Sequence, residues 1–462
     1  MATVRFSNFG GIAPGVAAGM LPENGALVAH NCRLMSGRLE PLREPGTDNR
    51  RVNFEGGLNA IGDARSLYLW HKGEESEWLA WAGRVRVAPS NLGVDRHRRL
   101  FVAGETGYRQ VDEAGVAHEN APVLFMARDR GYIKYPLIKA ALPKPDVRVV
   151  NAPDEGKALR YTYFFQTWVD SYGYESPVSV ASDEVVYNDG QQIRVGEFLL
   201  TDAYKAAVKR RIYKVVTGTE SESIQFVTEQ ERIGNRFLEG FFLVKDEDAG
   251  EIITEIEAPA WTLGEVLWMP GGFYAGVDWS DKRTVCFSDV NMPYSWPSGY
   301  RYTVKDDIVG IGLVGNTLVV LTEGSPWVVS GTLPEAMSVT SLSSPYACVS
   351  AESICTLGGT LFYASHGGIY GISEGSTSVQ PVTKGWWTSE AWEMMRPETC
   401  RMVAHDHALF LWFTAEDGST QGYVVDFLAG GGIKAVTTHD EPAGALFEDV
   451  ANGTLCYVRK GA

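Results

Sequence analysis

A hydrophobic hairpin recurs at nearly constant spacing in the C-terminal half of this 462-residue chain. Each copy begins at a Gly, Asn or Asp turn and continues into an apolar run. Leu318, Leu361, Leu409 and Leu455 mark four copies separated by 43, 48 and 46 residues, and Phe273 marks a fifth copy 45 residues before Leu318. This spacing is typical of four-stranded β-propeller blades, which stack around an axis because one blade cannot bury both of its faces.

The composition of the repeated segments favours strands over helices. They alternate with period 2 and are rich in Val, Thr, Tyr and Trp, which suit a pleated strand. The 50 glycines and the 11% of aromatic residues also fit a chain with many hairpins. The richest apolar stretch, 308–321, is interrupted by a Gly-Asn turn. It therefore predicts a pair of strands, and we expect no membrane-spanning segment.

A different segment separates the repeats from weaker strands of the same kind near the N-terminus. It opens with spaced prolines near residue 145, continues in long alternating strands, and fades near Pro259. This pattern predicts a small sandwich of fibronectin type III character. The predicted fold is all-β: a β-propeller with an inserted fibronectin type III-like β-sandwich and an N-terminal assembly arm. The predicted regions are the arm and first strands (1–60), N-terminal blades (61–144), the inserted sandwich (145–259) and C-terminal blades (260–462).

Charge and cysteine usage limit the possible functions. The 41 basic and 57 acidic residues give a net charge of −16, which suits the chain poorly to wrapping nucleic acid through phosphate contacts. The six cysteines show no Cys-x-x-Cys or zinc spacing, so we predict buried, reduced thiols in a protein made in the cytosol. Residues 1–21 lack the basic start and continuous apolar core of a signal peptide.

The stretch from Cys286 to Trp296 resembles a damaged Asp-box, the hairpin of sialidase-type propeller enzymes. Asp289 follows Ser288 directly, whereas a working Asp-box has its Asp two positions after the Ser. Met292 stands where Gly is expected, and the motif does not recur. We therefore interpret the stretch as a structural blade turn, with Trp296 packed between blades.

The trio His405-Asp406-His407 is the one candidate metal motif. Residues i and i+2 of a strand share a face, so two imidazoles could bind a metal, with His439-Asp440 as the nearest further pair. Asp406 lies where the other repeats have a turn residue, so a hairpin tip is the favoured interpretation. No nucleophile elbow, phosphate loop or dinucleotide fingerprint is present. We predict no catalytic, cofactor-binding or metal-binding residues.

Three charged stretches have simple interpretations. We predict that the acidic clusters at 72–77 and 245–251 are solvated loops. We predict a short solvated helix for the basic stretch 203–211, with a helical turn that contacts phosphate as the alternative.

Three segments resemble the tail nozzle, or tail tubular, proteins of short-tailed bacteriophages. The first is residues 9–45, where an Ala-rich stretch leads to Asn31, a turn at Gly37, and a strand with Leu39 and Pro41. The second is 161–179, where aromatic strands precede a turn with Gly173, Glu175, Ser176 and Ser179, followed by 209–214. The third is 318–373, with its Ser-Gly-x-x-Pro turn, Cys-Val-Ser segment and Gly-Ile-Tyr hairpin. The chain is shorter than the large members of that family.

The resemblance implies a structural virion protein, made in the host cytoplasm and assembled into the phage tail. It implies six copies in a ring below the portal and head-to-tail adaptor, outer surfaces for tail fibres or a needle, and a channel for viral DNA. We expect segment 1–45 to be ordered by neighbouring subunits or the adaptor. The acidic chain predicts an acidic or neutral channel wall that DNA passes without specific binding.

Two other functions remain open from sequence. One is a propeller glycosidase acting on host-surface polysaccharide, which carboxylates converging on the central pocket would favour. The other is a propeller that binds a host receptor or glycan, which aromatic residues clustered on one propeller face would favour.

Overall fold

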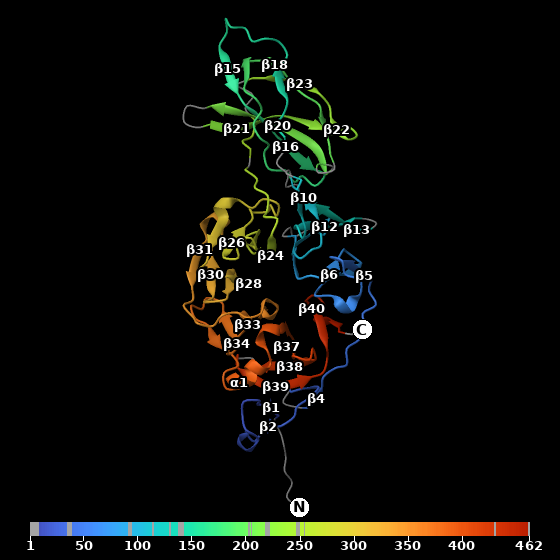
Figure 1. Cartoon of the computed structure of the whole chain (residues 1–462), viewed down its shortest axis with the longest axis vertical. Coiled ribbons are helices and arrows are strands. Elements are labelled where there is room, and N and C mark those ends of the chain that lie inside the picture. Colours follow the sequence, from blue (N-terminus) through green and yellow to red (C-terminus); the bar gives the residue numbers. More distant parts are fainter. Residues whose placement is uncertain are drawn as a thin grey trace, which may run out of the picture.

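Short sheets built mainly from strands adjacent in sequence make up most of the chain (Figure 1). The structure is a computed structural model and describes residues 9–34, 39–90, 95–112, 115–128, 131–136, 143–201, 204, 206–217, 222–245, 250–253, 255–428 and 431–460. The described part is all-β apart from the short helix α1 (Ser389–Met394) and several 3-10 turns. No helix among these residues has the length and apolar character needed to cross a bilayer.

Four consecutive antiparallel sheets account for the chain from 263 to 439. Their strands are β24 (Leu263–Met269), β25 (Phe273–Asp278), β26 (Thr284–Phe287) and β27 (Arg301–Thr303); β28 (Ile308–Val314), β29 (Thr317–Thr322), β30 (Trp327–Ser330) and β31 (Ser338–Ser341); β32 (Cys355–Leu357), β33 (Thr360–Ser365), β34 (Gly368–Ser373) and β35 (Gln380–Pro381); and β36 (Arg401–His405), β37 (Ala408–Thr414), β38 (Thr420–Phe427) and β39 (Ile433–His439). Each sheet adds its strands in sequence order, as expected for a meander.

An N-terminal sheet and a group made of two small sheets complete the series. The first contains β8 (Val85–Pro89), β9 (Leu100–Gly104), β12 (Val123–Arg128) and β13 (Gly131–Pro136), with the small hairpin β10 (Gln110–Val111) and β11 (Ala117–His118) beside it. The second is a pair of sheets in contact: β5 (Val52–Glu55), β7 (Ser76–Trp81) and β6 (Ser66–His71) form one, and β40 (Ala443–Asp449) and β41 (Thr454–Arg459) form the other, with β40 beside β6. Its two parts come from opposite ends of the chain.

The sheets form a closed ring. Strand β8 contacts β24, and contacts continue in order through β28, β32, β36 and β40 to β6. Trp70 and Trp81 of the β5–β7 sheet then share a core with Phe125 of the sheet that contains β8. Phe447 of β40 closes the ring, packing edge-on against Tyr68 at 5.3 Å and Trp78 at 5.6 Å between ring centroids. The propeller-like arrangement is visible in Figure 1, where the C-terminal strands return to β6. Strands from the N- and C-terminal parts of the chain therefore pack against each other.

The residues that mark the sequence repeat occupy equivalent places, as predicted. Phe273, Leu318, Leu361 and Leu409 are buried at or near the start of the second strand of their sheets. Leu455 is half-buried and is the second residue of β41, the second strand of the β40–β41 hairpin. The stretch 308–321 forms the strand pair β28 and β29, also as predicted.

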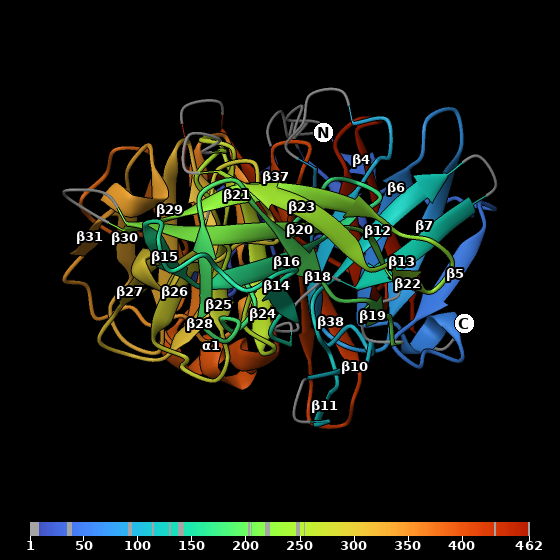
Figure 2. The same cartoon turned by 90° about the horizontal axis from the view of Figure 1, so that it is seen from above.

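Residues 147–244 form a separate body that projects from one end of the ring (Figure 1). Its strands are β14 (Val147–Val149), β15 (Leu159–Thr162), β16 (Phe164–Asp170), β17 (Val185–Asn188), β18 (Gln191–Val195), β19 (Phe198–Leu199), β20 (Ala207–Thr217), β21 (Glu222–Glu231), β22 (Arg236–Phe237) and β23 (Gly240–Val244). The sheets β14-β18-β23 and β16-β20-β21 share one core that includes Phe164, Ile193 and Ile212. Seen from above, β20 and β21 run across the end of the ring (Figure 2). We call this body the sandwich.

A tyrosine joins the sandwich to the ring. The aromatic ring of Tyr174, in the turn after β16, packs against that of Tyr294 in the ring of sheets, with centroids 4.4 Å apart. The Tyr174 hydroxyl contacts the guanidinium of Arg99. Asp95 holds Arg99 through an ion pair of 2.9 Å. Burial raises the pKa of Tyr174 above the ordinary range, so the phenol stays neutral. An aromatic and hydrogen-bonded contact of this kind fixes the junction.

The described part of the N-terminal arm pairs with strands of its own chain, and ordering of segment 1–45 by neighbouring subunits or the adaptor stays a prediction. Strand β1 (Gly11–Ile12) pairs in parallel with β39, and β2 (Gly25–Ala26) pairs with β1. Gly11 has φ +77°, and a Cβ there would lie 2.2 Å from the Val436 carbonyl oxygen, so glycine is required. The hairpin of β3 (Cys32–Arg33) and β4 (Glu40–Pro41) follows. The described residues 9–34 are thus held by their own chain, because the free edge of β39 offers backbone partners that no sequence pattern revealed.

All six cysteines are free thiols, and the predicted burial holds for four of them, whereas Cys355 and Cys456 are half-buried. Burial raises the pKa of Cys286 and of Cys348 to about 12, which keeps these thiols protonated.

Candidate functional site

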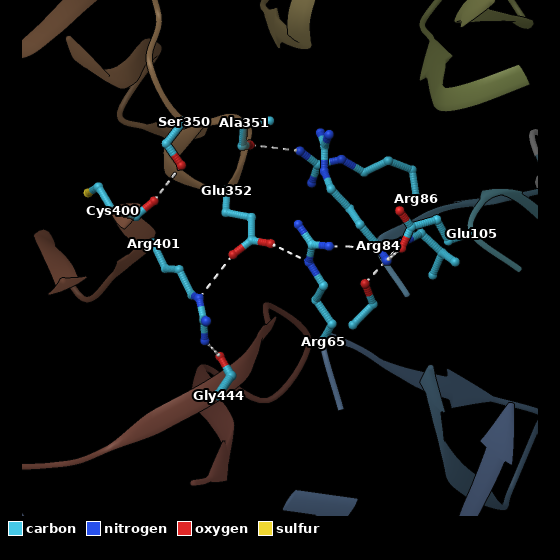
Figure 3. A network of polar contacts seen from close by, with 12 residues as sticks. Arg65, Arg84, Arg86, Glu105, Ser350, Ala351, Glu352, Cys400, Arg401 and Gly444 are labelled. Carbon is cyan, nitrogen blue, oxygen red and sulfur yellow. Dashed lines mark hydrogen bonds and ion pairs between the residues drawn. The ribbon is translucent and has the colours of Figure 1, made fainter. Parts of the chain in front are cut away.

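Charged side chains from separate sheets converge at the centre of the ring (Figure 3). Arg86 lies on β8, Glu265 on β24 and Arg401 on β36, and Glu352 lies on the 3-10 turn Ala351–Ser353 before β32. Arg65 and Arg84 immediately precede β6 and β8. These positions belong to the strands that contact one another around the ring, so their side chains meet although the sequence separates them widely. We call this set the central cluster.

Glu265 is the most deeply buried member of the central cluster. Glu265 is only 1% exposed. One carboxylate oxygen contacts the guanidinium of Arg84, and the other accepts a hydrogen bond from Nε of Arg86 at 2.9 Å. A buried carboxylate is costly unless it is paired and hydrogen-bonded, and here two arginines from the neighbouring sheet supply both contacts.

Glu352 links two further parts of the ring. It accepts from Nε of Arg65 at 3.0 Å and pairs with Nε of Arg401 at 2.9 Å. Arg401 also donates through Nη1 to the carbonyl of Gly444 at 2.9 Å, and Arg86 donates to that of Ala351 at 3.2 Å. These contacts tie the sheets that contain β6, β8, β32, β36 and β40 to one another (Figure 3).

The electrostatics of Arg84 reflect competing effects. Burial lowers its pKa below the ordinary value, and Arg86 and Arg65 act in the same direction. The carboxylates of Glu265 and Glu352 oppose them. The guanidinium remains charged throughout the physiological range, because the ordinary pKa of arginine is so high.

A cavity of about 370 Å³ lies beside the central cluster. Four arginines and two glutamates line it, together with aromatic and aliphatic side chains of β6, β8, β32, β36 and β40. The sequence interpretation missed these residues. The signal was the segment Arg84-Val-Arg-Val87, where alternation inside an apolar strand places two arginines on one face.

The Ser288 segment is a structural turn, as predicted. The Ser288 hydroxyl accepts from the backbone N–H of Tyr274 at 2.9 Å, and Asp289 accepts from the Ser295 hydroxyl at 2.5 Å. Trp296 is 1% exposed and packs in a cluster with Phe101 of the neighbouring sheet. The polar groups of this segment are therefore engaged in holding the turn and the inter-sheet contact.

The histidine trio forms a hairpin tip, as predicted. His405 ends β36, and Asp406 and His407 have φ of +46° and +60° in the two-residue turn that leads into β37. His439 does not join them: it is buried against Trp412 at 5.1 Å between ring centroids, and Asp440 pairs with His30 at 2.7 Å. The described residues contain no group of three or more His, Cys, Asp or Glu side chains placed to hold a metal.

Two of the charged stretches differ from their sequence interpretation. The expected helix at 203–211 is wrong for 207–211, which begin the long strand β20. There Lys209 and Arg211 pair with Glu229 on β21, because opposite charges face one another across the strands. In 72–77, Lys72 pairs with the buried Glu77 at 2.9 Å, so this stretch is only partly a solvated loop. Residues 203, 205 and 246–249 lie outside the described part.

Serine side chains make a second pattern that the sequence interpretation did not identify. Ser176, Ser179 and Ser182 follow β16 at intervals of three residues. Their hydroxyls accept from the backbone N–H groups of Trp168, Gln166 and Phe164 at 3.0, 3.0 and 2.9 Å. The serines thus satisfy the edge of β16 where Pro177 interrupts regular strand pairing.

Comparison with known proteins gives no family. No protein-family model and no curated protein matches this chain. Solved structures that match this chain weakly include a puromycin-hydrolyzing peptidase of Mycobacterium tuberculosis (11% identity, TM-score 0.26, 84% of this chain and 56% of that chain). Others are the AfRom2 CNH domain (10%, 0.26, 53% and 82%) and the WD40 domain of SCAP from fission yeast (11%, 0.23, 79% and 69%). Such TM-scores are too low to establish a shared fold or function.

Proposed function

We propose that this chain is a structural subunit of a short-tailed phage tail, a nozzle protein that assembles into a ring of six around a channel for viral DNA. In this proposal the closed ring of sheets is a β-propeller and residues 147–244 are its inserted fibronectin type III-like sandwich. The outer surfaces would carry tail fibres or a needle, and one end would meet the head-to-tail adaptor.

The observation that carries the proposal is that the carboxylates of the central cluster, Glu265 and Glu352, are both paired with arginines. Both oxygens of Glu265 contact arginines, and so do both oxygens of Glu352. A glycosidase needs two carboxyl groups free to approach the scissile bond, one as acid and one as nucleophile or base. Here the same groups cross-link sheets, which supports a structural role over the glycosidase alternative.

The segments that resemble nozzle proteins also have structural roles. Ser176 and Ser179 satisfy the edge of β16, and the N-terminal arm extends the sheet of β36–β39 outward. The arm presents Met20, Leu27 and Val28, which are 77%, 72% and 78% exposed. Exposed apolar side chains on such an arm suit a contact with another subunit.

Localisation in the virion tests the proposal. An antibody raised against the purified chain should decorate the tails of particles whose genome encodes it, and the chain should be present in about six copies per particle. Its absence from purified particles would reject the proposal.

Assembly provides a second test. Leu27→Asp together with Val28→Asp should prevent incorporation into tails while the ring still folds, since both side chains are exposed. Val450→Asp is the matched control, because Val450 is equally exposed (79%) but lies on the β40–β41 turn. Normal incorporation of the arm variant would remove the assembly role of this surface.

A further inference from the structure

The cavity beside the central cluster has an excess of positive charge. Its charged lining consists of Arg65, Arg84, Arg86 and Arg401 against Glu352 and Glu448. The whole chain carries a net charge of −16, whereas this lining has two more cations than carboxylates (4 − 2). Glu265 does not line the cavity, but its carboxylate forms ion pairs with Arg84 and Arg86.

The arginines retain hydrogen-bonding capacity. Each guanidinium has five N–H donors. The contacts within the described part of the chain use at most three of these on any of the four arginines. Half of the Arg65 side chain is exposed (51%), and 24% of that of Arg401. The glutamates therefore hold the guanidiniums in place without using all their donors, which is how a preorganised anion site is built.

An aromatic wall faces the same space. Tyr68 and Phe447 both line the cavity and contact each other edge to face. Burial raises the pKa of Tyr68 to about 12, so its hydroxyl is neutral and can donate. A cavity of about 370 Å³ that combines aromatic surface with a few fixed polar groups has the size and character of a site for a small ligand.

We propose that this central cavity binds an acidic sugar unit, whose carboxylate or phosphate is held by Arg65 and Arg401 and whose ring lies against Tyr68 and Phe447. The arginines supply paired N–H donors to the anion, the geometry in which guanidinium groups recognise carboxylate and phosphate. The site binds without reaction, because the neighbouring carboxylates are held by arginines. The inference does not depend on the tail assignment: the cavity belongs to a single chain.

Calorimetric titration of the full chain with glucuronate, glucose 6-phosphate and glucose tests the site. We expect saturable binding of at least one acidic sugar and none of glucose, and the acidic sugar that binds identifies the anion as carboxylate or phosphate. Absence of binding of both acidic sugars up to about 10 mM would overturn the proposal. Equal binding of glucose would also overturn it.

Variants locate the binding. Arg65→Gln should weaken it by about tenfold or more, since a charged hydrogen bond is lost. Arg50→Gln, a surface arginine paired with Asp48, is the matched control and should bind like the wild type. If Arg65→Gln does not fold, Arg65→Lys provides the test, because lysine keeps the charge but lacks the planar fork and should also bind more weakly. Wild-type affinity in a folded Arg65 variant would contradict the assignment.

Discussion

The ring and the sandwich bury cations in different ways. In the ring, Arg84 pairs with a carboxylate 181 positions away, and Arg33 of the arm pairs with the buried Asp426, 393 positions away. In the sandwich, Arg210 is 1% exposed yet donates to neutral groups, the side-chain oxygen of Gln166 at 2.7 Å and the carbonyl of Gly196 at 2.8 Å. Burial lowers the pKa of Arg210 to about 10.

The difference in how buried arginines are paired follows from how the sheets of each body are connected. A ring must join sheets that share no backbone hydrogen bonds, so charge pairs and aromatic packing connect them over long sequence separations. The sandwich is connected by long adjacent strands, and local side-chain to backbone hydrogen bonds are enough. Loss of a central charge should therefore affect the ring as a whole, whereas loss of a sandwich contact should remain local.

Removal of the Glu265 carboxylate should have the largest effect. Glu265→Ala leaves the partly buried Arg84 without its carboxylate partner, and we expect a loss of about 3 kcal/mol or more in the free energy of unfolding of the ring. Arg210→Met in the sandwich should cost less, about 1–3 kcal/mol, because it leaves only neutral acceptors unpaired. Urea unfolding followed by tryptophan fluorescence measures both, since Trp168 is the one tryptophan between residues 145 and 259. Equal losses would contradict the comparison.

Acid should destabilise the ring more than the sandwich. Burial lowers the pKa of His439 from 6.5 to about 4, against the opposing effect of Glu441. The folded ring thus favours neutral His439. The stability that the ring gains from a neutral His439 is fully present above pH 6.5. As the pH falls from 6.5 toward 4, the free energy of unfolding decreases by about 3 kcal/mol. Residues 145–259 contain no histidine.

Hydrogen exchange at pH 7 and pH 4 measures this difference region by region. His439→Gln, which cannot titrate, should flatten the pH dependence of the ring and leave that of the sandwich unchanged. A pH dependence of the ring that survives this substitution in full would show that His439 is not the cause.

Release of the arm should have an intermediate effect. Arg33 donates through Nη2 to Oδ1 of Asp426 at 2.8 Å. Arg33→Ala should lower the protection of residues 9–34 against hydrogen exchange by about 2 kcal/mol, since a hydrogen bond to a buried charge is lost. The control Arg50→Ala removes an exposed pair and should change protection by less than about 0.5 kcal/mol. Unchanged protection of the arm would mean that β1 pairing alone holds it.

The smallest effect should come from the serine contacts of the sandwich. Ser179→Ala removes the acceptor of the buried Gln166 N–H and should cost about 1 kcal/mol, confined to the sandwich transition in urea unfolding. Ser171→Ala, at an exposed position of the preceding turn, should stay within about 0.5 kcal/mol of the wild type. A shift of the ring transition by Ser179→Ala would show that the two bodies unfold together.

The sequence by itself determined the strands and their repetition. Period-2 alternation and turn residues predict the hairpins around Leu318, Leu361 and Leu409, because strand and turn formation depend on neighbouring residues. The hairpin tip at Asp406 and the structural role of Trp296 followed from comparison of the copies. The same local reasoning failed at 207–211, where the basic residues suggested a helix but pairing with β21 imposes a strand.

Only the tertiary structure decided which distant residues meet. The central cluster draws Arg65, Arg86, Glu265, Glu352 and Arg401 from five segments, and the arm finds its partners on β38 and β39 near the other end of the chain. Local patterns do not contain these contacts, since ring closure brings together the first strand of every sheet whatever their separation in sequence. The charges converge because burial at the axis requires each one to be paired, and the partner available there is set by the closed ring.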